Sequence, residues 1–283
     1  MKSRIILGWW ALRPKQWTKN VLVLVAPFAA GVNTFSQLRI SVFAFVAFSA
    51  ASSIGYLVND LNDIEIDRGH PKKGKRPFAS GALSPRFGYL MIGLLLVFLV
   101  LLLLAFTPKF ALVVYLYLFN SVLYTKFFKS YPVLEMFLVA VGFVLRLIAG
   151  ALALNLALSE WFLIVGGFGA LYIVSIKRLA ELKQENLREV RKVINSYSSD
   201  FLNFVAYSSS SVTLTSYCLW AFDQVSKPFW YQISVLPFMI ALFRFGWISD
   251  RKSIEVPEDT ILHDRPMLFS STVLIATLSI AVF

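Results

Sequence analysis

The sequence predicts an all-α, polytopic membrane protein with about nine transmembrane helices. Hydrophobic residues make up 58% of the 283 positions and charged residues only 15%, whereas a soluble domain carries about 25% charged residues. The mean hydropathy is +0.69. The apolar residues also come in blocks of about twenty, the length that crosses a hydrocarbon core of about 30 Å at about 1.5 Å per residue. No linker or change of composition divides the chain, so we expect one domain over residues 1–283.

The expected helices are bounded by turn residues and by the ends of the apolar blocks. Pro108 and Pro228 would each lie in a first helical turn, where the missing N–H is harmless. The run Leu94–Leu104 is nearly all aliphatic, so we expect its helix to meet lipid. We expect transmembrane helices near residues 20–34, 38–58, 87–106, 109–125, 132–154, 160–178, 201–222, 229–248 and 266–283.

The basic residues give these helices an orientation. Most of the 27 Lys and Arg residues fall on alternate connections, and the opposite connections hold only Arg39, Lys109 and Lys227. Cytoplasmic loops of membrane proteins carry an excess of Lys and Arg, so the pattern predicts a cytoplasmic N-terminus and an external C-terminus in the inner (cytoplasmic) membrane. We expect no nucleic-acid partner, because the net charge of +11 is divided among membrane loops.

The acidic residues gather at the end of the second expected helix. Asn59, Asp60, Asp63 and Asp67 fall within nine positions, and on a helix the three aspartates would share one stripe, with Glu65 pointing away. Like charges at a membrane boundary repel one another, and a divalent cation would relieve that repulsion. Oxygen ligands alone favour magnesium over zinc, and magnesium usually shares its coordination shell with phosphate oxygens. The alternative is a solvated helix end whose acids pair with the basic residues that follow.

Basic residues that an anionic substrate could use lie in three places. Arg76 belongs to a basic loop after the acidic cluster. Lys15 and Lys19 lie directly before the first helix, where they also suit ordinary anchors of a cytoplasmic segment. Arg146 lies inside an apolar helix, where an unpaired cation costs about 2.5–3.5 kcal/mol or more. Its partner should therefore be a substrate phosphate or an acid from another helix.

The pattern Asn-Asp-x-x-Asp-x-x-x-Asp after the second of nine helices resembles the UbiA superfamily of intramembrane prenyltransferases. Over nearly its whole length, the chain more closely resembles one branch of this superfamily, the decaprenyl-phosphate phosphoribosyltransferases. The acidic pattern specifies the superfamily, and the other segments together indicate the branch. Those segments are Arg13–Asn20, His70-Pro71, Arg76-Pro77, Gly142–Gly150, Lys177–Leu182, Pro257-Glu258 and Asp264-Arg265.

The sequence departs from these relatives in two places. Glu135 stands where the branch tends to have aspartate; its longer side chain could still reach a metal or a ribose hydroxyl. The connection between helices 6 and 7 lacks the Asp-x-x-x-Asp pair of quinone-forming members, and begins instead with Lys177 and Arg178. The second departure makes an aromatic prenyl acceptor less favoured.

The resemblance implies a UbiA-like bundle that transfers 5-phosphoribosyl from phosphoribosyl diphosphate to a polyprenyl phosphate and releases diphosphate. Magnesium on Asp60, Asp63 and Asp67 would stabilise the charge on the leaving diphosphate, and Asn59 would add a hydrogen bond. The acceptor phosphate is already anionic, so no strong general base is required. The residues expected to bind the substrates are Lys15, Lys19 and Arg76, together with Lys129, Glu135, Arg146, Lys177 and Arg178. Of these, Lys129, Arg146, Lys177 and Arg178 suit the 5-phosphate, and Lys15 and Lys19 suit the acceptor phosphate.

Two other functions stay open. A UbiA-type prenyltransferase would use the same magnesium cluster with a prenyl diphosphate donor and an aromatic acceptor. An anion transporter would use Arg146 as a binding charge within the membrane, but it would need charges along a path, and the sequence masses them at one face. The lipid bilayer is a partner in every case, and a homo-oligomer is compatible with each.

Overall fold

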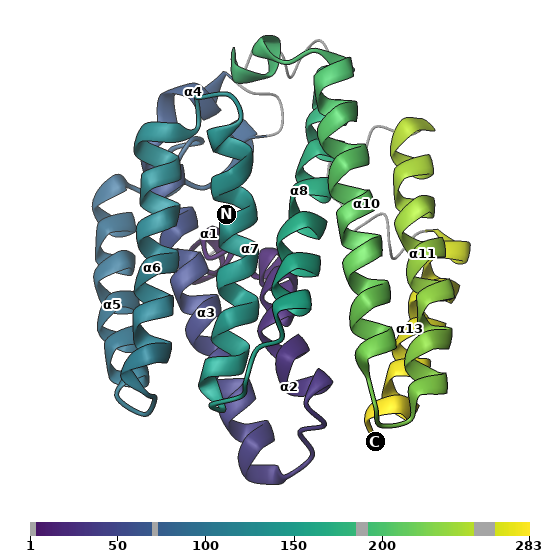
Figure 1. Cartoon of the computed structure of the whole chain (residues 1–283). Helices are drawn as coiled ribbons and strands as arrows, with labels where there is room; N and C mark the ends of the chain where they lie inside the picture. The colour runs from purple at the N-terminus through teal and green to yellow at the C-terminus, as the bar shows by residue number, and fades with distance from the viewer. Residues whose placement is uncertain (1–3, 70–72, 185–191, 252–263) are drawn as a thin grey trace. The chain divides into compact units, whose positions relative to one another are not determined.

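The computed structural model describes residues 4–69, 73–184, 192–251 and 264–283. Every regular element in those ranges is a helix (Figure 1). The elements are α1 (Arg4–Ala11), the 3-10 helix η1 (Pro14–Leu24), α2 (Val25–Ala29), α3 (Phe35–Asn62), α4 (Ile64–Arg68), η2 (Lys73–Lys75), α5 (Pro85–Leu103), α6 (Pro108–Leu123), the π-helical turn η3 (Tyr124–Phe128), α7 (Leu134–Ala153), α8 (Glu160–Leu182), η4 (Lys192–Ser196), α10 (Ser199–Asp223), α11 (Pro228–Arg251) and α13 (Arg265–Val282).

Seven helices of the described part are long and apolar enough to cross a membrane: α3, α5, α6 with η3, α7, α8, α11 and α13. The all-helical membrane fold is thus confirmed, whereas the count of nine spans is not. The expected span at 20–34 is divided between η1 and the short α2. The expected span at 201–222 lies in α10, which carries the run Ser208–Ser211 and further hydroxyl residues that lower its hydropathy.

The chain forms two compact units, and neither is one continuous segment. The first comprises Met1–Pro27, Val32–Lys129 and Leu145–Leu156, and the second comprises Phe28–Gly31, Ser130–Val144 and Ala157–Phe283. Helix α7 contributes its first half to the second unit and its second half to the first. The single domain expected over residues 1–283 stays a prediction.

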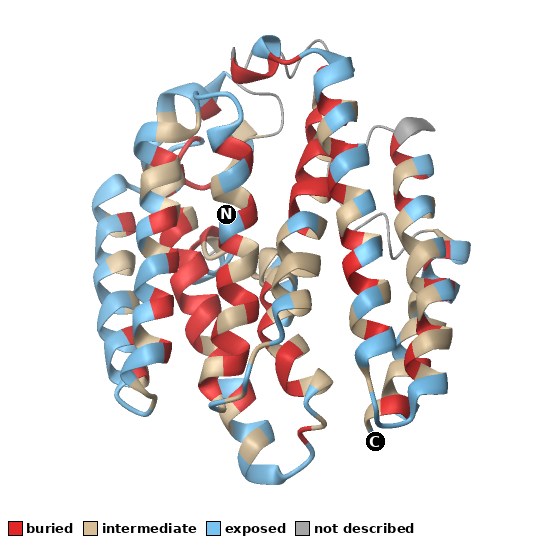
Figure 2. Ribbon diagram, viewed as in Figure 1, coloured by how far each residue is buried: buried red, intermediate tan, exposed pale blue. Residues whose placement is uncertain are grey.

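In the first unit, α3 is the central helix. Its small side chains, among them Ala44, Ala47 and Ala51, are fully buried and allow close helix packing. Figure 2 shows α3 largely buried, while much of α5 is exposed. The α5 side chains Leu94 and Leu101 are each 63% exposed, in keeping with the expected lipid-facing helix.

In the second unit, α8 packs along α10, and α11 packs along α13. Side-chain caps define two of the helix starts: the Ser198 hydroxyl accepts a hydrogen bond from the Phe201 N–H, and Asp264 accepts one from Met267. Asp264 also forms a two-point ion pair with Arg244 of α11, at 3.0 and 2.9 Å. The ion pair ties the start of α13 to α11.

Candidate active site

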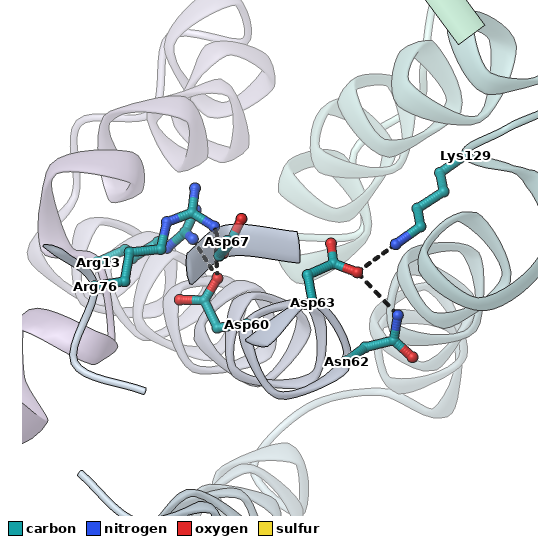
Figure 3. A network of polar contacts seen from close by, with 7 residues as sticks. All are labelled: Arg13, Asp60, Asn62, Asp63, Asp67, Arg76 and Lys129. Carbon is teal, nitrogen blue, oxygen red and sulfur yellow. Dashed lines mark hydrogen bonds and ion pairs between the residues drawn. The ribbon is translucent and has the colours of Figure 1, made fainter. Parts of the chain in front are cut away.

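The acidic cluster lies where α3, the first long helix, ends. Helix α3 stops at Asn62, Asp63 leaves helical geometry with φ −106° and ψ 15°, and α4 begins at Ile64. As Figure 3 shows, Asp60 and Asp67 point toward one another on one side, whereas Asp63 points to the other. The single helical stripe of three aspartates expected from the sequence is therefore wrong, because the helix is interrupted at the middle aspartate. Glu65 points away from the cluster, as expected, and its side chain is 82% exposed.

Two buried carboxylates converge on one cation. The Arg76 guanidinium donates to Asp67 Oδ2 at 2.5 Å and to Asp60 Oδ1 at 3.2 Å, and both aspartates are 2% exposed. Arg13 also donates to Asp60 and lies 5.1 Å from the centre of the Tyr56 ring. The basic loop after the cluster thus does supply a residue to it, as the sequence analysis expected for Arg76.

Arg13 is a site residue that the sequence analysis did not single out. Its backbone has φ 55°, in the left-handed region that a residue other than glycine rarely adopts, and Pro14 follows at the start of η1. Such strain persists where the surroundings hold it in place, and it gathers at functional sites. The Arg13-Pro14 pair is visible in the sequence, but the sequence does not show that Arg13, at the start of η1, lies beside Asp60 near the end of α3.

On the other side of the turn, Asp63 has partners of its own. Lys129, at the end of η3, forms an ion pair with Asp63, and the Asn62 side-chain amide donates to the same carboxylate at 3.0 Å. Arg68 pairs with the exposed Glu65 at 2.8 Å. The alternative to a metal site was that the acids pair with the basic residues that follow them. Glu65 does so, with Arg68. The aspartates of the cluster instead bind Arg13, Arg76 and Lys129.

The donor chemistry of Asp60 and Asp67 fits magnesium. Their carboxylates already accept a positive group between them, and magnesium is usually held by one or two carboxylates together with water and substrate phosphates. The described residues bring no group of three His, Cys, Asp or Glu side chains together. Asn59 lies one position before Asp60, and its side chain hydrogen-bonds to none of the described residues. A site of two carboxylates completed by a diphosphate fits this arrangement better than a site of three.

The two lysines expected at the acceptor phosphate lie on η1. The Lys19 ammonium donates to Gln16 Oε1 at 2.7 Å, and Lys15 is exposed. Because Arg13 directly precedes η1 and binds Asp60, the same segment carries these lysines and one cation of the cluster.

Arg146 is buried in the first unit. Its guanidinium donates to Asn20 Oδ1 at 2.8 Å and to the Tyr117 hydroxyl at 2.9 Å, and it lies 4.6 Å from the centre of the Tyr117 ring. Asn20 in turn donates to the hydroxyls of Ser49 and Ser52, at 3.2 and 3.1 Å. The arginine thereby joins α7 to η1 and α6. The structure supplies amide, hydroxyl and aromatic partners where the sequence analysis expected a phosphate or an acid.

In the second unit, Glu135 and Arg178 bind each other. Two parallel hydrogen bonds of 2.6 Å join the guanidinium to the carboxylate, and Arg178 also donates to Glu181 at 2.7 Å. Glu135 is fully buried and Arg178 is 3% exposed. Direct contact of Arg178 with a 5-phosphate, and of Glu135 with a metal or a ribose, stays a prediction that would require this pair to separate. Lys177 lies beside Arg178 on α8 and is half-buried.

Tyr197 completes this network. Its hydroxyl accepts a hydrogen bond from the Val133 N–H at 2.8 Å and donates to Glu135 at 3.3 Å. Burial raises the pKa of Tyr197 to about 12, so its hydroxyl stays protonated at neutral pH. Val133 has φ 68°, a strained conformation for a β-branched residue, and the Tyr197 bond helps to hold it.

Comparison with known proteins decides the family. The UbiA prenyltransferase family model matches residues 20–271, which is most of the chain. The chain belongs to the UbiA prenyltransferase family. It is 40% identical to the decaprenyl-phosphate phosphoribosyltransferase of Corynebacterium glutamicum, over 90% of this chain and 80% of that protein. It is 39% identical to the protein of the same name from Mycobacterium tuberculosis, over 96% of this chain and 93% of that protein.

Solved UbiA structures have the same fold. A UbiA homologue from Archaeoglobus fulgidus, bound to DMAPP and Mg²⁺, superposes with a TM-score of 0.74 at 18% identity, over 96% of each chain. At that identity the likeness concerns the fold alone. The family model and the relatives at 39–40% identity confirm the sequence resemblance to the UbiA superfamily.

The buried pair of this UbiA protein leads to a prediction about stability. Arg178→Ala should destabilise the fold by about 3–5 kcal/mol, because Glu135 would stay buried without its cation. Replacing both partners, in Glu135→Leu with Arg178→Met, should recover most of that loss. Thermal unfolding of the purified variants in detergent measures both effects.

The exposed pair of Arg68 and Glu65 provides the matched control. Glu65→Ala removes this pair and leaves the Arg68 hydrogen bond to the Ala79 carbonyl in place, and it should cost about 0–1 kcal/mol, since exposed ion pairs contribute little. A double variant at positions 135 and 178 that is as unstable as the sum of its two single variants would contradict the interpretation.

Proposed function

We propose that this protein transfers 5-phosphoribosyl from phosphoribosyl diphosphate to a polyprenyl phosphate of the decaprenyl type, releasing diphosphate with the aid of magnesium. The observation that carries the proposal is the convergence of the buried Asp60 and Asp67 carboxylates on a single cation. The proposal is also supported by the names of two relatives at 39–40% identity, which are both decaprenyl-phosphate phosphoribosyltransferases. The donor supplies the diphosphate that a two-carboxylate magnesium site needs.

Asp60 and Asp67 would hold the magnesium, and Asn59 would add a neutral hydrogen bond to the donor. When bound, the metal acts as a Lewis acid that stabilises negative charge on the departing diphosphate. Arg13 and Arg76 lie against the same carboxylates, and their planar guanidinium groups can turn to diphosphate oxygens and bind them in a two-point manner. The cluster therefore holds both the acids and the cations that orient a diphosphate.

The chemical step exchanges one bond at C1 of the ribose. The C1–O bond to the diphosphate breaks, and an oxygen of the acceptor phosphate forms the new C1–O bond. Lys15 and Lys19 on η1 would bind the acceptor phosphate. Lys129, Arg146, Lys177 and Arg178 remain the proposed residues for the 5-phosphate, and Lys129 forms an ion pair with Asp63 of the cluster.

The direct test is a reconstituted reaction. Purified protein is incubated with phosphoribosyl diphosphate, polyprenyl phosphate and magnesium, and the lipid fraction is analysed by mass spectrometry for the phosphoribosylated product. Product should form in parallel with diphosphate, and a chelator should abolish both. Absence of product from folded protein under these conditions would overturn the proposal.

A second candidate is a prenyltransferase with an aromatic acceptor, because a solved UbiA homologue was obtained with DMAPP and Mg²⁺. A parallel incubation with a prenyl diphosphate and 4-hydroxybenzoate tests it. Turnover in that incubation alone would favour the second candidate over phosphoribosyl transfer.

We further propose that the protein lies in the inner (cytoplasmic) membrane with its N-terminus and active site on the cytoplasmic side. A reporter fused after Phe283 should then appear outside the cytoplasm, and one inserted between Lys183 and Arg191 inside it. Paired phosphatase and fluorescent-protein fusions measure the two positions. Reporters on the same side would mean that an even number of spans separates them, as would follow if α10, which is not among the seven helices that could cross a membrane, did not cross it.

A further inference from the structure

A cavity of about 470 Å³ lies among α8, α10 and α11, which are neighbours within the second unit (Figure 1). Its volume falls in the range of small-molecule sites, about 300–1,000 Å³. None of the residues that line it belongs to the aspartate cluster or to the substrate-binding residues proposed above. The cavity therefore has no role in the function proposed so far.

One end of the cavity is polar. Lys183 caps the C-terminus of α8, and Ser199 is the first residue of α10, so the antiparallel course of the two helices brings them to the same end. Asn203, one turn further along α10, lines the cavity too. Within the described residues, the side-chain amide of Asn203 makes no hydrogen bond. Polar groups in a partly buried site normally have a partner, so this amide points to a ligand or to water.

The rest of the cavity is mostly apolar and aromatic, and the hydroxyls of Ser210 and Ser249 in its lining donate to backbone carbonyls of their own helices. The buried side chains of Ile176 and Tyr172 line the cavity. The Tyr172 hydroxyl donates a hydrogen bond to the Leu242 carbonyl at 3.1 Å. Phe243 and Trp247 also line the cavity and are 57% and 46% exposed. Tryptophan is a typical residue of the membrane interface.

Trp247 is held in place from outside the cavity. The Arg244 guanidinium lies 4.2 Å from the centre of the Trp247 ring, and Asp264 fixes that guanidinium through two hydrogen bonds. A stacked cation of this kind restrains the ring. The apolar wall is thus preorganised, which lowers the cost of binding a ligand.

We propose that this cavity binds a lipid with an anionic, phosphorylated head group. The phosphate accepts hydrogen bonds from Lys183, Asn203 and Ser199, and the first part of the hydrocarbon chain lies against Ile176 and Phe243. A free anion would leave the apolar wall without a partner, and a purely apolar ligand would leave the Asn203 amide without one. A membrane offers two sources of this chemistry, an anionic phospholipid and an isoprenoid phosphate.

Native mass spectrometry of the full chain in detergent tests the proposal by binding alone, independently of turnover. The probes are phosphatidylglycerol, geranylgeranyl phosphate, phosphatidylcholine and inorganic phosphate. We expect at least one of the two anionic lipids to be retained, with about ten-fold weaker binding in Lys183→Ala and in Asn203→Leu, because each removes a donor to a charged group. Asn203→Leu keeps the side-chain size and guards against a folding artefact.

Lys126→Ala is the matched control, since Lys126 is an exposed lysine that does not line the cavity, and its lipid binding should equal that of the wild type. The tighter of the two anionic lipids identifies the source. Unchanged binding in both cavity variants, or equal retention of phosphatidylcholine, would overturn the proposal. So would displacement of the lipid by inorganic phosphate at equal concentration, because the hydrocarbon chain would then contribute nothing.

Discussion

Asp60→Asn and Asp67→Asn should each lower the turnover of phosphoribosyl diphosphate by about 10²–10³-fold. Both carboxylates are buried and share one cation, so the loss of either charge leaves a single carboxylate to hold a magnesium ion that is worth several kcal/mol in the transition state. Asparagine preserves the size of each side chain, so the folded protein should be recovered in normal yield. Initial rates of diphosphate release, at saturating magnesium, measure the effect.

Two further variants test whether the effect is specific to the carboxylates that would hold magnesium. Glu65→Gln should keep at least half of the wild-type rate, because the Glu65 side chain is 82% exposed and pairs with Arg68. Asp63→Asn should weaken magnesium binding, measured by calorimetry without substrate, less than Asp60→Asn does, because Asp63 faces Lys129. Equal loss of magnesium affinity in the three aspartate variants would restore the three-carboxylate site expected from the sequence.

The sequence alone was sufficient for the fold class and the location of the acidic cluster. Both depend on local patterns: apolar blocks of a fixed length, and acids spaced along one helix end. The interruption at Asp63 was not predictable in this way, because no Gly or Pro marks it, and the low helix propensity of Asn62 and Asp63 is too weak a signal to place a break. A break of one residue was enough to send one of the three carboxylates to the opposite side.

The partners of the buried charges could not be predicted either. Periodicity shows that Arg146 must have a partner, but Asn20 is 126 positions away in the chain. In the same way, Arg178 and Glu135 are separated by 43 positions, and both appear in the sequence as candidate ligands for a substrate. The sequence does not show whether such a residue binds a ligand or another side chain of the protein; only the tertiary contacts do.

Gly150→Ala should displace η1 and lower the midpoint of thermal unfolding by roughly 5–10 °C. A Cβ at position 150 would lie 2.0 Å from the Val23 carbonyl oxygen, which belongs to the backbone and cannot rotate away. Overpacking of this kind costs about 1–3 kcal/mol or more. Turnover should fall by more than ten-fold as well, because η1 carries Lys15 and Lys19, and Arg13 precedes it. Thermal unfolding and initial rates are measured on the same preparation.

Gly93→Ala is the matched control, because a Cβ at Gly93 of α5 meets no atom within 4 Å. Alanine favours a helix over glycine by about 1 kcal/mol, so this variant should be as stable as the wild type or slightly more so. If Gly150→Ala lowered the unfolding temperature but left turnover unchanged, the close contact between α7 and η1 would serve packing alone. If turnover fell together with stability and was not restored by lower assay temperature, the contact would be what holds the lysines of η1 and Arg13 in register with the aspartates of α3 and α4.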